Sequence, residues 1–311
     1  MIPLRHRFQA GLALVELLVA AAIGLVILAG AGTIFAAANT DHIAQADEAD
    51  AEEGGRYALE VIGRAVRQAG YVDWTADASA NNGAPALQGL DAASLDKTSA
   101  GIANPLAAAV NGSDVLAVHF DGAGKAPNGD GSVVNCAGFA VPEHQQGWSI
   151  FYIARAADGS GELRCKYKAK NGWSADAVVP GVDGFQVLYG IDTDEPADGV
   201  PNRYVNASAI DAMDAAIVLS GATEEARRQE LNARSWWNRV ASVRYAVLLR
   251  GAKSPPGADA ARTYELFGAE YADQLGNADT GTRLVEGNLA GRSPLRSRRI
   301  FTATVAIRGR P

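Results

Sequence analysis

The sequence lacks the residue patterns on which most enzyme chemistry and nucleic-acid binding depend. It has only four histidines in 311 residues, no Ser-His-Asp order stands out, and no Gly-x-Ser-x-Gly nucleophile motif is present. The net charge of −7 argues against a nucleic-acid partner, because proteins that bind nucleic acid present basic surfaces. These absences predict a protein that is neither an enzyme nor a nucleic-acid-binding protein.

Charge is also missing from the apolar run of residues 12–38, except at Glu16. As a helix this run would be roughly 40 Å long, which is enough to cross a hydrocarbon core of about 30 Å. It is too long for the apolar region of a signal peptide, which holds roughly 7–15 residues. Arg5 and Arg7 precede the run and acidic residues follow it. The positive-inside rule therefore predicts a cytoplasmic N-terminus, with the rest of the chain outside the membrane.

Glu16 has two interpretations. A carboxylate in hydrocarbon costs roughly 2.5–3.5 kcal/mol, and an ordinary signal anchor can tolerate one such group near its end. Alternatively, cleavage after Gly11 makes Leu12 the first residue and Glu16 the fifth. The new ammonium group, of the same chain or of a neighbouring copy, can then pair with the carboxylate. At an effective dielectric constant near 20 and a separation of about 4 Å, this attraction is worth roughly 4 kcal/mol.

Only two cysteines are present, Cys136 and Cys165. Both lie on the predicted outer side of the membrane, in an oxidising compartment that favours disulfides. One intramolecular pairing is possible, and it would stabilise the fold by roughly 3–4 kcal/mol. Two free thiols are the alternative, and we predict the disulfide.

The rest of the chain alternates between helical and strand-like patterns. Residues 39–71 continue the helix, with Ala58, Val61, Ile62, Ala65, Val66 and Ala69 on one face. Gly54-Gly55 is expected to weaken or kink it, and Gly70 to cap it. A long loop is expected over 72–112, a hairpin turn over 158–161 and a helix over 223–232. Strands are expected over 114–120, 149–155, 162–167, 185–189, 240–250 and 299–308. A long helix packed on an antiparallel sheet indicates an α+β head.

The acidic loop after residue 191 is the candidate metal site. Asp192, Asp194 and Asp198 can offer hard oxygen ligands to Ca²⁺, although the spacing is not that of an EF-hand. A solvated acidic turn is the alternative. No other cofactor is expected.

The segment from Gln9 to Ala20 resembles the class III leader of type IV prepilins and pseudopilins. The resemblance implies cleavage after Gly11 by a prepilin peptidase and N-methylation of Leu12. It also implies that Glu16 registers the subunit against its neighbour during filament assembly.

Five blocks, at residues 53–59, 67–71, 184–194, 237–250 and 298–308, resemble PilW-type minor pilins of the type IV pilus. This resemblance implies a type IV pilin-like α+β fold. Its parts are a leader (1–11), a transmembrane and filament-core helix (12–38), the periplasmic half of that helix (39–71) and a globular head (72–311).

The implied function is priming of pilus assembly, at the pilus tip, in a complex with other minor pilins. The implied partners are those minor pilins, the major pilin, prepilin peptidase, a tip adhesin and the inner membrane. The protein would pass from the inner membrane into the pilus on the cell surface, where pili serve adhesion and twitching motility. A type II secretion pseudopilin is the alternative, and the PilW-like blocks in the head disfavour it. A membrane-anchored periplasmic enzyme is a third possibility, disfavoured because the sequence offers no cluster of titratable residues.

Overall fold

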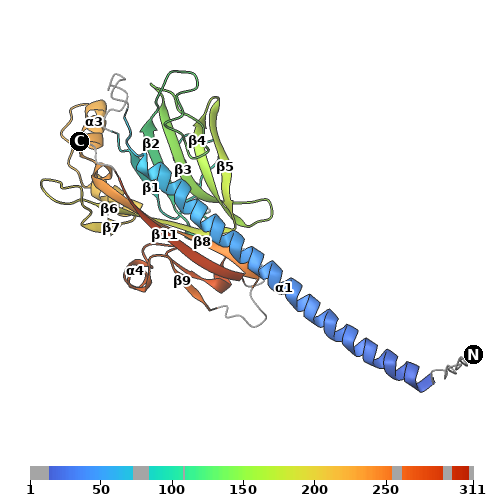
Figure 1. Cartoon of the computed structure of the whole chain (residues 1–311). Helices are drawn as coiled ribbons and strands as arrows, with labels where there is room; N and C mark the ends of the chain where they lie inside the picture. Colours follow the sequence, from blue (N-terminus) through green and yellow to red (C-terminus); the bar gives the residue numbers. More distant parts are fainter. Residues whose placement is uncertain (1–13, 73–83, 108, 254–260, 290–295, 308–311) are drawn as a thin grey trace, which may run out of the picture. The chain divides into compact units, whose positions relative to one another are not determined.

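The computed structural model describes residues 14–72, 84–107, 109–253, 261–289 and 296–307 (Figure 1). By their internal contacts the residues form two compact units, Met1–Asp47 and Glu48–Pro311. In the part of the chain that the structure describes, the first unit holds the beginning of helix α1 (Leu14–Arg67), and the second holds the end of α1 and the strands.

Two antiparallel sheets make up most of the second unit. The larger sheet has the strand order β1-β2-β3-β4-β5. These strands are β1 (Leu87–Leu90), β2 (Val115–Asp121), β3 (Gln146–Arg155), β4 (Gly161–Ala169) and β5 (Gly172–Pro180). The other sheet has the order β11-β8-β6-β7. It is built from β6 (Val182–Ile191), β7 (Arg203–Val205), β8 (Val240–Lys253) and β11 (Arg296–Ala306). A helix with antiparallel sheets confirms the predicted α+β, pilin-like class.

Short elements fill the connections between these strands. Among the described residues these include the helices α2 (Ala207–Ala215), α3 (Glu224–Arg234) and α4 (Ala269–Leu275). They also include the 3-10 turns η2 (Val110–Gly112), η3 (Trp236–Arg239) and η4 (Glu286–Asn288). Between β8 and β11 the chain adds the small sheet of β9 (Thr263–Glu265) and β10 (Arg283–Val285).

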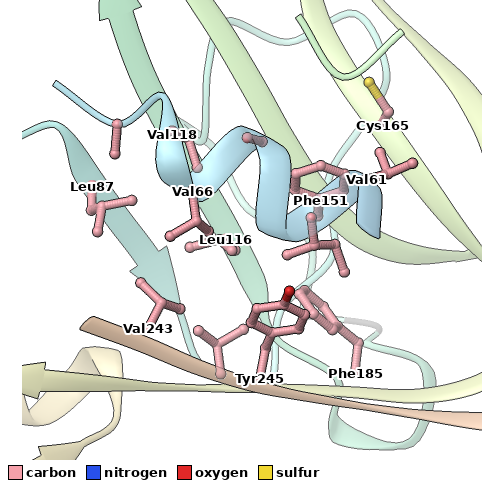
Figure 2. Packing of buried hydrophobic residues seen from close by; sticks show 14 of the residues in the cluster. Val61, Val66, Leu87, Leu116, Val118, Phe151, Cys165, Phe185, Val243 and Tyr245 are labelled. Carbon is pink, nitrogen blue, oxygen red and sulfur yellow. The ribbon is translucent and has the colours of Figure 1, made fainter. Parts of the chain in front are cut away.

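The core of the second unit lies between the end of α1 and the two larger sheets. All six residues of the predicted stripe, Ala58, Val61, Ile62, Ala65, Val66 and Ala69, are buried in it. Figure 2 shows Val61 and Val66 among side chains of both sheets, including Phe151 and Tyr245. Each large apolar side chain buried in this way contributes roughly 1.5–3 kcal/mol. The pattern of the stripe therefore predicted its packing correctly.

The helix α1 is unbroken at Gly54-Gly55, contrary to the expected kink. A Cβ atom on Gly55 would lie 2.5 Å from the Phe301 ring, and one on Gly54 would lie 3.2 Å from Leu249 and Val179. The two glycines allow the strands to approach the helix backbone closely. Tertiary packing of this kind overrides the poor helix propensity of glycine. After the helix, Gly70 has a positive φ of 68°. Its amide donates to the carbonyl of His119 on β2 and not to a helix carbonyl, so Gly70 does not form the expected helix cap.

The predicted strands and the 158–161 hairpin are present, and Thr223 caps the predicted helix as α3. Five of the described strands were not predicted, namely β1, β5, β7, β9 and β10. Three of them, β7, β9 and β10, hold only three residues each. The strand β1 lies inside the expected loop of residues 72–112, and β5 is an edge strand of the larger sheet. Only Val179 is buried in β5, so this strand lacks the alternation of apolar residues that identifies a half-buried strand.

Candidate functional site

The first unit exposes apolar side chains on every side of the helix. Large side chains there are between 52% and 76% exposed in the single chain, namely Leu14, Val15, Leu17, Leu18, Val19, Ile23, Leu25, Val26, Ile27, Leu28, Ile34, Phe35 and Ile43. This part of α1 is long and apolar enough to cross a membrane, by length and composition. A helix that is apolar all round requires lipid or other protein around it. It is therefore the first candidate site for assembly.

Glu16 lies in the first turn of α1. It is the one charged residue of the apolar run within its described part, residues 14–38. The partial positive charge at a helix N-terminus favours a carboxylate at this position. The residues Gly11 and Leu12, at which processing is predicted, lie outside the described residues. Cleavage, methylation and the pairing of Glu16 with a new amino group thus stay predictions.

The acidic loop begins where β6 ends. The carboxylate of Asp192 is buried, and it accepts hydrogen bonds from the backbone amides of Asp194 (2.9 Å) and Gly199 (2.6 Å). These two bonds lower the pKa of Asp192 below its ordinary value, because they stabilise the charged form. Asp192 thereby holds the loop closed and remains ionised at neutral pH.

The loop brings the three predicted ligands together. One carboxylate oxygen each from Asp192, Asp194 and Asp198 lie within 4.8 Å of one another. Asp194 also accepts a bond from the side-chain amide of Asn202, at 3.1 Å. Hard carboxylate oxygens suit Ca²⁺, but that ion takes about 6–8 oxygens, of which these residues would supply only part. Calcium binding by these residues stays a prediction.

The two cysteines form the predicted disulfide. Cys136 is bonded to Cys165, with 5.8 Å between their Cα atoms. The bond joins the segment before β3 to the middle of β4, and the backbone amide of Cys136 also donates to Ser149 Oγ at 2.9 Å. The long segment between β2 and β3 is thereby tied to the larger sheet.

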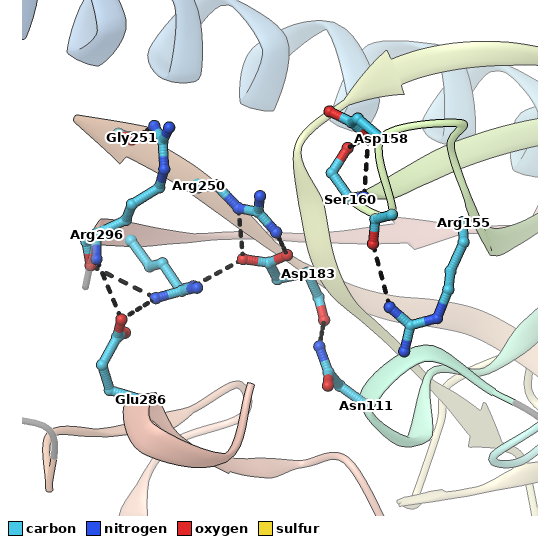
Figure 3. A network of polar contacts seen from close by, with 11 residues as sticks. Asn111, Arg155, Asp158, Ser160, Asp183, Arg250, Gly251, Glu286 and Arg296 are labelled. Atoms are coloured by element: carbon cyan, nitrogen blue, oxygen red, sulfur yellow. Dashed lines mark hydrogen bonds and ion pairs between the residues drawn. The ribbon is translucent and has the colours of Figure 1, made fainter. Parts of the chain in front are cut away.

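A buried network of charges, which sequence reasoning missed, joins the strands of the second sheet. Asp183 on β6 accepts bonds from Arg250 on β8 (3.1 Å) and from Arg298 on β11 (2.7 Å). Arg298 also contacts Glu286 of η4. Figure 3 shows Asp183 between Arg250 and Asn111, whose side chain donates to the Asp183 carbonyl at 2.6 Å. The network fixes the connection between β8 and β11 to the sheet.

The comparison with known proteins found a family match within the head of the chain. Residues 150–309 match the family model PilW, described as type IV pilus-assembly protein W. The matched range holds 160 of the 311 residues, just over half of the chain. The range runs from the middle of β3 to the end of β11 and includes the acidic loop. The family match therefore does not depend on the leader or on α1. No curated protein and no solved structure matches the chain.

Proposed function

The chain belongs to the PilW family of type IV pilus-assembly proteins, and on this premise we propose that it is a minor pilin that primes filament formation. The family match supports a part in pilus assembly. Two further features support the role of a subunit: an apolar helix segment exposed on all sides, and one acid near its start. The combination of a PilW-type head with such a helix is the observation on which the proposal depends.

The anchor helix is proposed to exchange one apolar environment for another. In the inner membrane its apolar side chains contact lipid, with the head in the periplasm. During assembly the same side chains pack against the helices of other pilins, so their area stays buried throughout. In both states the apolar surface of residues 14–43 is covered, as its exposure in the single chain demands.

The Glu16 carboxylate is proposed to supply the register of that packing. Prepilin peptidase cuts after Gly11, and Leu12 becomes the methylated N-terminus. A pair between this amino group and a Glu16 carboxylate stabilises one axial position of neighbouring helices, whereas apolar contacts alone permit many. An ion pair in a low-dielectric setting is strong, and its charge-assisted hydrogen bonds form only when the two groups are in direct contact, which suits it to this task.

The proposed partners are other minor pilins, the major pilin and a tip adhesin. A priming complex forms before the shaft grows, so the protein ends at the tip of the pilus on the cell surface. There it would contribute to adhesion and twitching motility without chemistry of its own.

Complementation of a strain that lacks the protein tests this proposal. Glu16→Val removes the acid and keeps the segment apolar, so the variant should insert in the membrane but leave cells without surface pili and without twitching. Glu53→Val is the control, since Glu53 is an exposed acid of the same helix outside the apolar segment. Normal piliation with Glu16→Val would remove this carboxylate from the mechanism.

A further inference from the structure

A pocket lies on the face of the larger sheet that does not contact α1. Side chains alternate between the two faces of a strand. In β2, Leu116 and Val118 belong to the core with α1, whereas Val115 and Ala117 belong to a separate cluster on the opposite face. On that opposite face a pocket of about 490 Å³ is open to solvent. It is distinct from the helix surface proposed for assembly.

Tryptophan is concentrated in this pocket. Three of the five tryptophans of the chain line it: Trp148 on β3, Trp173 on β5 and Trp237 in η3. The rings of Trp148 and Trp173 meet edge to face, with 5.4 Å between centroids and 77° between planes. The His119 ring packs against Trp148, with 3.4 Å between the ring centres. Both tryptophans are half-buried, so each still leaves part of its indole surface accessible. Two adjoining, accessible indoles on a sheet offer rigid flat surfaces to a ligand.

Polar groups accompany the indoles. The exposed carboxylate of Asp211, in α2, accepts a hydrogen bond from Trp237 Nε1 at 2.9 Å. Its second oxygen can accept a bond from a ligand. The carboxamide of Gln88 on β1 adds a donor and an acceptor to the same lining. The pocket thus joins flat apolar surface to a few fixed polar groups, which is the usual composition of a small-molecule site.

The wall of the pocket is held in place by a buried lysine. The ammonium group of Lys166, on β4, donates to the carbonyl of Asp96 and to Ser99 Oγ, both at 2.9 Å. The segment that it fastens leads directly into the wall at residues 100–103. There Gly101 lies against Trp148, where a Cβ atom would be 3.4 Å from the ring. A wall fixed in this way reduces the ordering cost of binding.

One charge of each sign lies near the pocket, Lys166 beside Trp173 and Asp211 beside Trp237, so neither a cation nor an anion is strongly favoured. The Lys166 ammonium already lies 5.5 Å from the centre of the Trp173 ring, so it repels a second cation from that indole. Anions are disfavoured by Asp211 and by the net charge of −7. What remains is a neutral molecule with a flat apolar face and several hydroxyl groups. Pyranose sugars have this form, since their ring C–H groups make one apolar face while hydroxyls project from the rim.

We propose that this pocket binds a neutral pyranose oligosaccharide. Its rings would stack on Trp148 and Trp173, with hydroxyl groups bonded to Asp211 and Gln88. This assignment does not depend on the proposed role in pilus assembly, because the pocket and the apolar segment of α1 share no residue.

The test uses the full chain in micelles of a detergent without a sugar headgroup, because alkyl glycosides would compete for the site. Chitohexaose and cellohexaose are titrated while tryptophan fluorescence and saturation-transfer NMR are recorded. At least one of them should give a saturable fluorescence change, with magnetisation transferred to the sugar ring protons. Trp173→Leu should weaken binding at least about tenfold, the equivalent of 1.4 kcal/mol.

Two further variants separate binding from folding. Asp211→Asn keeps an acceptor for Trp237 and removes only the charge at an exposed position, so it should bind the sugar several-fold more weakly while folding normally. Trp236→Leu removes a tryptophan outside the pocket and should bind as the unaltered chain does. The assignment is overturned if neither hexasaccharide binds. It is equally overturned if folded Trp173→Leu or folded Asp211→Asn binds the sugar as tightly as the unaltered chain does. Binding of the cation tetramethylammonium in place of the hexasaccharides would overturn it too.

Discussion

The two parts of α1 use the same kinds of apolar residue in different patterns. In residues 14–43 large apolar side chains occupy all sides of the helix and are exposed in the single chain. In residues 51–66 the buried positions form one stripe, and charged residues such as Arg56 and Glu60 occupy the other side. A narrow stripe needs one partner surface, which the chain's own sheets supply. A helix that is apolar all round needs lipid or other protein around it, and this difference is the reason for proposing residues 14–43 as the assembly surface.

Truncation of one isoleucine in each part tests the comparison most strongly. Ile62 of α1 is fully buried against the strands of the head, and Ile62→Ala should lower the free energy of unfolding of the head by about 2–5 kcal/mol, because it leaves a cavity. Ile27 is 64% exposed, and Ile27→Ala should leave head stability unchanged. Denaturant unfolding of the full chain in micelles, followed by near-UV circular dichroism, measures both. Equal losses in the two variants would contradict the division of α1 into two parts.

The head should also respond to pH through a buried histidine, whereas the apolar segment has no such group. Neither ring nitrogen of His119 has a hydrogen-bond partner within the described residues, and burial lowers its pKa from 6.5 to about 4. The unfolded chain therefore takes up a proton as the pH falls below 6.5, and the folded chain does so only near 4. Stability supplied by the neutral imidazole is lost between these values, by up to about 3 kcal/mol.

His119→Phe isolates this contribution. It keeps an aromatic ring against Trp148, whose ring centre lies 3.4 Å from that of His119. Burial also raises the pKa of Asp114, which acts in the opposite direction by favouring the fold as the pH falls. The quantity to measure is therefore the difference in unfolding free energy between the unaltered protein and His119→Phe, followed from pH 7 to pH 4. A difference that does not change with pH would show that His119 is not held neutral.

The smallest expected effect concerns calcium at the acidic loop of the head. With a dissociation constant of about 10⁻⁴–10⁻³ M, typical of extracellular sites, about 10 mM calcium should stabilise the head by about 1.4–2.7 kcal/mol. The combined change Asp194→Asn and Asp198→Asn should abolish the gain. Thermal unfolding with calcium, with magnesium and with chelator measures it. An unfolding temperature that is the same in all three would show that the loop is a solvated turn.

Local patterns in the sequence predicted much of the fold. The stripe at residues 58–69 was predicted from its helical periodicity, and β6 and β8 from their runs of strand-forming residues. The edge strand β5 has no alternation of apolar residues that could have predicted it. The kink expected at Gly54-Gly55 is absent because the Phe301 ring packs closely against the helix there. In both cases the deciding information is the packing of another element.

The candidate sites were also predictable only where a local pattern in the sequence defined them. The cysteine pair and the acidic loop could be predicted, because a single pairing or a short spacing defined each of them. Asp183 and Arg298 lie 115 residues apart, and they meet only because β11 pairs with β8 so that Arg298 is opposite Arg250. The pocket of Trp148, Trp173 and Asp211 likewise combines two strands and a helix. No spacing in the sequence indicates such a site before strand order and register are known.

Mass spectrometry of the N-terminal peptide shows whether Leu12 becomes the first residue of the mature chain. The protein should be isolated from membranes and from sheared pili of cells with an active prepilin peptidase. We expect a peptide that begins at Leu12 with one added methyl group. A chain that retains Met1 in such cells would contradict it, because Glu16 would then have no new amino group to pair with.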